Sequence, residues 1–520
     1  MTATTATADM KQPRGLYTLF STEAFERFSY YGMRALLVLY LVNHLQFERA
    51  DALSVYAVYT GLVYFTPLIG GYLADKFLGA RKAILIGGVV MGLGQFALAF
   101  SSVLPGGTFL GIPASVFLNA ALGLLICGNG FFKPNISTIV GGLYGDNDPR
   151  RDGGFTIFYM GINLGAFFSP LVCGTLGELV GWGWGFGMAG LGMALGVGIF
   201  LHGQSKIGLA GFPPGREVTA ESRLNRKDYQ DVLLYILASI ALVLVIVLGW
   251  AGMGALGLNG ILKSGVMAIG VIGMAAVGQK MLQGTSEQGG DAPAHKEPLT
   301  LEEKHRLVVI AVLTFFNIFF WMGFEQAGGT MNLFADQNTD RSLFGFAIPA
   351  SYFQSINPLI IVTGAPLFSI MWKYWDRSKF ALATSQKMAT GMLLLGLGFV
   401  VMYFAQKMAF GGVLVSPLWL VAVYFIHTMG ELFLSPIGLS MITKLSPVRM
   451  VSLMMGIWFT SSAIANFFAG KLEALLHGWQ QGADDPTALL WTFLIVSSMS
   501  AGILLWILSP LLNKWTHGRA

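Results

Sequence analysis

The chain has 520 residues, of which 54% are hydrophobic and only 11% charged, and its formal net charge is +5. Soluble domains usually carry about 25% charged residues, so this composition excludes an ordinary water-soluble fold. Apolar runs of about 20 residues, the length that spans a bilayer, recur along the whole sequence. We therefore expect an all-α polytopic membrane protein in a lipid bilayer. The small positive charge reflects topology in this interpretation, and no nucleic acid is expected as a partner.

The apolar runs predict fourteen spans in a six-plus-two-plus-six order. The first six lie near 16–44, 52–74, 82–102, 112–140, 153–179 and 184–203. A polar linker at 204–228, two further spans near 229–251 and 258–282, and a second polar segment at 283–304 follow. The last six lie near 305–334, 349–372, 384–406, 415–444, 450–475 and 487–513. We expect a six-helix bundle over 1–203, linkers with two additional helices over 204–304, and a second six-helix bundle over 305–520.

Lysine and arginine positions set the predicted orientation, because cytoplasmic loops are enriched in positive charge. With both termini in the cytoplasm, the predicted external side holds only five of the 32 basic residues, namely Arg49, Lys263, Arg341, Lys407 and Lys471. Residues 1–14 are polar and lack the apolar stretch of a signal peptide. Both cysteines, Cys127 and Cys173, lie in apolar runs, so we expect buried thiols and no disulfide.

Two short internal matches indicate related halves. Gly128–Pro134 and Gly430–Pro436 share Gly, Phe and Pro at the same spacing. Tyr31-Gly-Met-Arg34 in the first span has a counterpart in Met322-Gly-Phe-Glu325. Internal repeats of this kind are typical of secondary transporters, which bind their substrate at the repeat interface.

Charged residues inside the predicted spans are the strongest functional signal, because they are costly in lipid and usually face the bundle interior in pairs. Three- and four-residue steps put part of the first span on one polar stripe. Its candidate members are Glu23, Glu26, Arg27, Tyr30, Tyr31 and Arg34. Further ionisable residues in spans are Lys133, Glu325, His427 and Glu431.

The internal matches predict how these charges pair. We expect two ion pairs between the halves, Arg34–Glu325 and Lys133–Glu431, which protonation could open. The alternative is that they are static salt bridges that fix how the halves dock. Glu23 is expected to be partly solvated near the cytoplasmic end, and His427 to be a packing residue.

Other polar and aromatic residues lie at a plausible pocket depth, although single aromatics in spans more often pack in the core. They are Tyr64, Tyr159, Asn163, Trp321, Asn357, Trp458 and Ser462. As a set they suit a small polar substrate with variable side chains.

Several chemistries lack their sequence signatures. There is no Gly-Lys-Ser or Gly-Lys-Thr of a phosphate-binding loop, no cluster with metal-ligand spacing and no Gly-x-Ser-x-Gly. We expect no cofactor, no metal and no enzymatic activity, and an ion gradient as the energy source. Protons are favoured over sodium because protonation neutralises a carboxylate directly and breaks its ion pair.

Three motifs resemble those of a known family. Gly70–Lys82 resembles the loop signature of the major facilitator superfamily. Glu23-x-x-Glu-Arg-Phe-x-Tyr-Tyr-Gly32 resembles the first-helix motif of the proton-dependent oligopeptide transporters, and Phe155–Gly165 and Gly430–Pro436 resemble that family's other signatures. The resemblance covers essentially the whole chain, and the two additional central helices are similar to those of bacterial members. One local departure is Ala166, where the family often has Ser.

The resemblance implies a major facilitator fold in the bacterial inner (plasma) membrane that imports di- and tripeptides with protons by alternating access, as a monomer. It implies that Tyr31, Arg34 and Lys133 meet the peptide carboxylate, and that Asn163, Asn357 and Glu431 meet its amino terminus. It implies side-chain pockets at Tyr30, Tyr64, Trp321, Trp458 and Ser462, proton coupling at Glu23, Glu26, Arg27 and Glu325, and a conformational loop with Gly71, Asp75 and Arg81. Alternatives are a major facilitator transporter of another small polar or anionic solute, such as nitrate or a drug, and a non-coupled channel.

Overall fold

The structure is a computed structural model that describes most of the chain. The described ranges are 11–104, 107–109, 111–145, 148–212, 223–255, 299–343, 345–375, 377–378, 381–447, 450–480 and 486–518. Within these ranges, eleven helices are long and apolar enough to cross a membrane. The charged first helix and the tenth helix of the six-plus-six scheme are long helices as well. The second additional helix, predicted near 258–282, lies outside the described residues.

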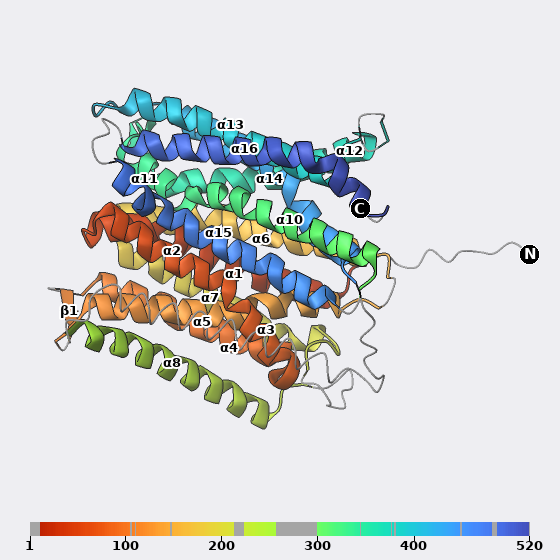
Figure 1. Ribbon diagram of the computed structural model, residues 1–520. Helices are drawn as coiled ribbons and strands as arrows, with labels where there is room; N and C mark the ends of the chain where they lie inside the picture. Colours follow the sequence, from red (N-terminus) through yellow and green to blue (C-terminus); the bar gives the residue numbers. More distant parts are fainter. Residues whose placement is uncertain are drawn as a thin grey trace, which may run out of the picture. The chain divides into compact units, whose positions relative to one another are not determined.

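The first half of the sequence forms helices that follow the predicted apolar runs (Figure 1). They are α1 (Arg14–Leu39), η1 (Tyr40–His44), α2 (Arg49–Phe65), α3 (Pro67–Leu73), η2 (Ala74–Leu78), α4 (Ala80–Ser102), α5 (Ala114–Gly141), α6 (Arg151–Gly174), η4 (Thr175–Val180), α7 (Trp182–Gly203), η5 (Gln204–Lys206) and α8 (Arg226–Ala255). A small hairpin of β1 (Thr108–Phe109) and β2 (Ile112–Pro113) joins α4 to α5. Gly79 separates η2 from α4 with a φ of 74°, a left-handed backbone that glycine adopts without strain.

The second half is equally helical. Its elements are α10 (Leu301–Phe324), η6 (Glu325–Gly328), α11 (Thr330–Gln337), η7 (Ala350–Ser355), α12 (Ile356–Trp375), α13 (Thr384–Ala409), α14 (Leu418–Leu445), α15 (Val451–Gln480) and α16 (Pro486–Trp515). The hairpin β3 (Ser342–Leu343) and β4 (Phe346–Ala347) precedes η7. Thr300 begins α10 with a capping box that uses Glu303.

Several predicted spans break or change helix type within their length. The span expected at 305–334 breaks at Glu325, where α10 gives way to the 3₁₀ segment η6 and then to α11. The break coincides with close packing, because a Cβ on Gly328 would overlap the Tyr56 hydroxyl of α2. The span expected at 16–44 changes at Tyr40 into the π-helical turn η1.

The chain forms two compact units that do not follow the sequence halves. One unit contains Met1–Gly32, Thr66–Ser169 and Phe186–Gly252, and the other contains Met33–Phe65, Pro170–Gly185 and Met253–Ala520. The second unit therefore includes the end of α1, all of α2 and the end of α6 together with the second half of the sequence. The boundaries expected at 203/204 and 304/305 remain a sequence prediction.

The internal repeat is visible in matching glycine contacts. In the first unit a Cβ on Gly128 of α5 would lie 2.7 Å from the carbonyl oxygen of Gly87 in α4. In the second unit a Cβ on Gly430 of α14 would lie 2.7 Å from the carbonyl oxygen of Gly391 in α13. Gly128 and Gly430 are the first residues of the two matched sequence motifs. Glycine lets two helix backbones approach closely at the same place in each half.

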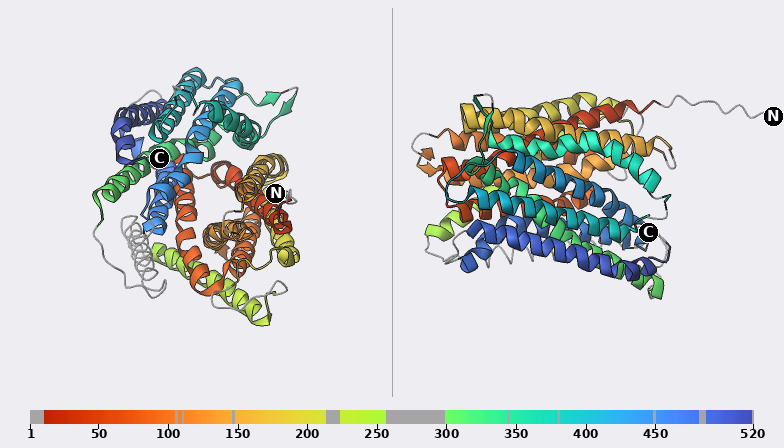
Figure 2. Two further views of the ribbon diagram at one scale, coloured as in Figure 1. Left: turned by 90° about the vertical axis from the view of Figure 1, so that its right-hand side faces the viewer. Right: turned by 90° about the horizontal axis from the view of Figure 1, so that it is seen from above.

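The additional helix α8 packs against α5 in the first unit, and Figures 1 and 2 show it in yellow-green alongside the orange helices. Phe131 of α5 meets Tyr235 edge to face, with ring centroids 6.4 Å apart, and a Cβ on Gly123 would lie 2.8 Å from Val243. At the other end, the Lys82 Nζ atom of α4 lies 2.8 Å from Asp231 Oδ2 and 3.5 Å from Asp228 Oδ1. Apolar packing and an ion pair thus fix α8 to this unit.

Candidate substrate and proton-coupling site

An acid–base cluster lies within α1 in the first unit. The Arg27 guanidinium donates through Nη2 to Glu26 Oε1 at 2.6 Å and through Nε to Glu26 Oε2, and the same Nε lies 3.3 Å from Glu23 Oε1. All three residues are buried, and Glu23 is only 3% exposed, so the expectation of a partly solvated Glu23 is wrong. Its position one turn before Arg27 turns the carboxylate inward to the guanidinium instead of to solvent.

Aromatic rings cover the other side of this guanidinium. Arg27 lies 5.1 Å from the Tyr30 ring centroid and 5.9 Å from that of Tyr31, a cation–π arrangement. The two tyrosine rings meet edge to face at 5.2 Å. Five of the six predicted members of the polar stripe on α1 therefore form one cluster around Arg27, whereas Arg34 belongs to the second unit.

Helix α6 brings its predicted motif against this cluster. Gly165 is the contact point, since a Cβ there would lie 3.0 Å from Arg27 Cβ and would overlap the Ala24 carbonyl oxygen. Asn163 is buried, and its Nδ2 donates to the Tyr159 carbonyl oxygen one turn earlier, at 3.0 Å. The charge of Lys133 on α5 also acts on the Glu23 carboxylate within the same unit.

The Arg34–Glu325 ion pair that the sequence predicts is present in the second unit. The Arg34 Nη2 atom contacts Glu325 Oε2, and both side chains are less than a tenth exposed. Arg34 Nε also donates to the Tyr56 hydroxyl at 2.7 Å. Tyr56 carries no functional signal in the sequence, because one tyrosine in an apolar run gives no sign of which neighbour its hydroxyl meets.

A second carboxylate lies close to this pair. Glu431 on α14 accepts a hydrogen bond at 2.7 Å from Asn357 Nδ2 of α12, which also donates to Thr428 Oγ1 at 3.0 Å. Glu325 and Glu431 are near enough to affect each other electrostatically. Two buried carboxylates in one unit provide groups that can exchange protons. The predicted pairing of Glu431 with Lys133 remains a prediction.

Trp458, one of the two tryptophans predicted to line the side-chain pockets, is held by residues of neighbouring helices. Trp458 on α15 is 7% exposed, and a Cβ on Gly438 of α14 would overlap its indole ring. Ser461 donates to the Trp458 carbonyl oxygen at 2.7 Å and accepts from Asn317 of α10 at 2.9 Å.

The remaining predicted pocket residues of the second unit are less enclosed. Trp321 on α10 packs edge to face on Phe320 and Phe324, at 5.4 and 5.3 Å. Tyr64 on α2 and Ser462 on α15 are half-buried. The structure leaves their contact with substrate a prediction.

His427 has the packing role expected from the sequence. It is 2% exposed, its ring lies 4.7 Å from that of Phe399, and its Nε2 is 3.2 Å from the Leu395 carbonyl oxygen. Among the described residues, no group of three His, Cys, Asp or Glu side chains is arranged to hold a metal ion.

Arg81 fixes the end of the glycine-rich loop Gly70–Lys82 through hydrogen bonds to backbone carbonyl oxygens. Arg81 is fully buried at the start of α4 and donates to the carbonyl oxygens of Ala210 at 2.7 Å, Gln204 at 3.3 Å and Gly208 at 2.5 Å. The ring of Phe212 covers it at 4.0 Å. Gly71 packs on Pro134, whereas Asp75 is exposed. Arg81 thus binds the segment that follows α7.

Long apolar helices with buried, paired charges define a membrane transporter, and its fold is that of the major facilitator superfamily. The family model described as PTR2, POT family, matches residues 81–212 and 291–484. A relative from Bacillus subtilis (strain 168), named an uncharacterized transporter YclF, is 35% identical over 512 residues, which cover 97% of this chain and 95% of the relative. The chain therefore belongs to the POT family.

Two further similarities carry functional names. The peptide transporter YePEPT of Yersinia enterocolitica subsp. palearctica serotype O:3 (strain YE-P4) is 34% identical over 469 residues, covering 88% of this chain and 87% of that protein. A crystal structure titled as peptide transporter POT in complex with sulfate superposes with a TM-score of 0.78 at 34% identity, covering 97% of this chain and 96% of that one. Both similarities extend along nearly the full length of the chain.

Proposed function

We propose that this chain is a proton-coupled symporter that imports di- and tripeptides by alternating access. The observation that carries the proposal is the buried Arg34–Glu325 ion pair beside the Asn357–Glu431 hydrogen bond. A guanidinium suits a peptide carboxylate, and a carboxylate with an amide suits a peptide amino terminus. The name of the Yersinia relative supports the substrate class.

Proton coupling follows from the chemistry of the pair. An ionised Glu325 holds Arg34, and a protonated Glu325 releases much of that attraction. Arg34 is then free to accept the carboxylate of a substrate. Glu23 and Glu26, which share Arg27, are a second place where a proton can exchange for a cation contact.

The proposed location is the bacterial inner membrane, with both termini in the cytoplasm and a monomer as the working unit. The distribution of basic residues supports this orientation. Labelling of a cysteine introduced near either terminus, in intact cells and after permeabilisation, tests it. We expect the introduced cysteine to react only after permeabilisation.

Uptake into proteoliposomes tests the function. We expect labelled dialanine to accumulate above the external concentration when the interior is alkaline, and a protonophore to abolish the accumulation. A sodium gradient at equal pH should give equilibration only. Uptake that is independent of any gradient would favour a channel, and uptake of nitrate in preference to dialanine would favour an anion carrier.

A further inference from the structure

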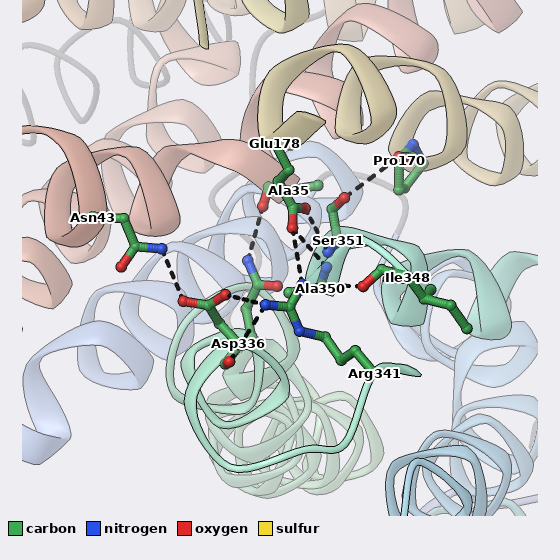
Figure 3. A network of polar contacts seen from close by, with 10 residues as sticks. Ala35, Asn43, Pro170, Glu178, Asp336, Arg341, Ile348, Ala350 and Ser351 are labelled. Atoms are coloured by element: carbon green, nitrogen blue, oxygen red, sulfur yellow. Dashed lines mark hydrogen bonds and ion pairs between the residues drawn. The ribbon is translucent and has the colours of Figure 1, made fainter. Parts of the chain in front are cut away.

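A largely buried carboxylate, Glu178, lies at the end of the second unit that the charge distribution predicts to be external (Figure 3). Glu178 lies in η4 at the end of α6, and its side chain is 9% exposed. Its Oε2 accepts the backbone N–H of Ala350 at 2.7 Å, and its Oε1 accepts that of Ser351 at 3.0 Å. A residue from the first half of the sequence therefore binds the start of η7, in the second half.

The start of η7 lacks a cap of its own. Pro349 occupies the N-cap position and makes no side-chain cap hydrogen bond. The first N–H groups of a helix have no partner within the helix, and a negative charge there is stabilising. Glu178, from another segment, supplies both the hydrogen-bond acceptor and the negative charge. The helical stretch that it caps consists of η7 and α12 and has 26 residues.

Arg341 ties this cap to a second group of contacts. Its Nη1 lies 3.4 Å from Glu178 Oε2 and donates to the Ile348 carbonyl oxygen at 3.0 Å, and its Nη2 donates to Asp336 Oδ1 at 2.8 Å. The other oxygen of Asp336 accepts from Asn43 Nδ2 at 2.8 Å. Figure 3 shows one connected network that joins η1, η4, α11 and η7.

The capped stretch leads directly to the site. Asn357, the donor to Glu431, lies seven residues after Ala350 in the same continuous helical stretch. Neighbouring contacts hold the two segments close, since Thr175 Oγ1 and the Tyr352 hydroxyl are 2.6 Å apart and Ser351 is fully buried. Movement of η4 away from η7 would remove the cap and one of the two carboxylates beside Arg341, leaving Asp336.

We propose that Glu178 is a positioning residue of the transport cycle. It closes one end of the carrier by capping the η7–α12 stretch, and it thereby couples that closure to the position of Asn357. This inference rests on the proposed alternating-access function. In it, Glu178 stabilises the closed state relative to a state open at that end, and its removal shifts the equilibrium towards the open state.

Cysteine accessibility tests closure without any substrate. In a background with Cys127→Ser and Cys173→Ala, Ala350→Cys places a thiol at the capped position, where Ala350 is fully buried. We expect Glu178→Ala to raise the rate of maleimide labelling about tenfold, equivalent to about 1.4 kcal/mol, and Glu178→Gln to raise it less, since the amide keeps an acceptor oxygen. The measurement in detergent micelles lets the reagent reach both ends, so it does not depend on the predicted orientation.

Asp340→Asn is the matched control. Asp340 is an exposed acid next to Arg341 in sequence, and among the described residues its side chain accepts from the backbone and side chain of Ser342. This variant should label at the parent rate. A parent rate in both Glu178 variants would overturn the proposal. A changed rate together with no dialanine uptake by the parent protein would leave the closure role standing and contradict the proposed function instead.

Kinetics in proteoliposomes distinguish positioning from damage. With more carriers open at the substrate side and fewer completing the closure, Glu178→Ala should lower both the KM for dialanine and the maximal rate. A loss of folded carrier would lower the maximal rate alone. An unchanged KM in Glu178→Ala would therefore contradict the proposed coupling to Asn357.

Discussion

Glu325 ends α10, and its carboxylate meets the Arg34 guanidinium where both side chains are nearly closed to solvent. Removing one partner from a buried ion pair typically costs about 3–5 kcal/mol, since the other charge loses its compensation. The strength of such a pair depends on the ionisation of its carboxylate, which is the property that the proposed proton coupling uses. Tyr56 adds a hydrogen bond to Arg34 that does not depend on the ionisation of Glu325.

We predict that Glu325→Gln abolishes gradient-driven accumulation, because glutamine cannot bind or release a proton. Exchange of labelled for unlabelled dialanine should persist in part, since the amide still accepts a hydrogen bond from Arg34. Proteoliposome uptake with and without a pH gradient, beside counterflow, measures both. Gradient-dependent accumulation at the level of the unmodified protein would remove Glu325 from the coupling mechanism.

Lys133 is predicted to contact the peptide carboxylate together with Arg34, and to pair with Glu431 in the empty carrier. An ammonium is a compact point charge that can change partners, whereas a guanidinium prefers a fixed fork geometry. Lys133→Ala should lose peptide binding and active uptake, and Lys133→Arg should bind but transport slowly. Competition by free and by C-terminally amidated dialanine, with the amide expected to compete weakly, checks the carboxylate contact. Equal competition by the two peptides would contradict it.

Trp321 and Trp458 are predicted to limit the side-chain pockets. Replacing a large aromatic with alanine opens space, so either change should alter the ranking of bulky peptides more than the uptake of dialanine. Gly438→Ala is the complementary change, because a methyl group there displaces the Trp458 indole without removing it. Competition series with dialanine and with phenylalanine-containing dipeptides check this. A uniform loss for every peptide would indicate a folding role.

At the scale of elements, apolar patterning predicts the helices well and their interruptions poorly. The break at Glu325 coincides with the close packing of Gly328 against Tyr56, a contact between distant segments that apolar patterning does not encode. The matched motifs at Gly128 and Gly430 gave a correct guide to equivalent helix contacts, because only glycine permits that approach. They could not identify Glu178, whose partners are backbone N–H groups that carry no sequence signature.

The docking of α8 yields a prediction at this scale. Lys82→Ala should loosen α8, because the Lys82 and Asp228 side chains are both over nine-tenths buried and lose their ion pair. Ser239→Cys offers a readout, since position 239 lies next to Cys127 of α5 and disulfide formation between the two thiols reports how closely α8 stays on α5. Mass spectrometry of the linked peptides should show a lower yield in Lys82→Ala. Lys76→Ala, which removes an exposed cation from the same loop, should leave the yield unchanged.

At the scale of the whole molecule, the division into two compact units differs from the division between the two sequence halves. Sequence repeats favour a division between the halves, yet the end of α1, α2 and the end of α6 belong to one unit with the second half. Within that unit α2 packs closely on α15, and polar contacts include Arg49 Nε to Glu473 Oε1 at 2.5 Å and Asn332 Nδ2 to the Ala35 carbonyl oxygen at 2.8 Å. Such contacts belong to a single conformation, whereas the sequence must be compatible with every conformation that the proposed transport cycle visits.

The hydrogen bonds from Arg81 to three carbonyl oxygens form a contact in which neither partner changes its protonation state. A guanidinium stays charged at any pH that a cell experiences, and peptide carbonyls do not titrate. The bond between α4 and the segment after α7 therefore has the same strength on either side of a proton gradient. A proton-coupled cycle of the kind proposed can therefore proceed without loosening this part of the scaffold.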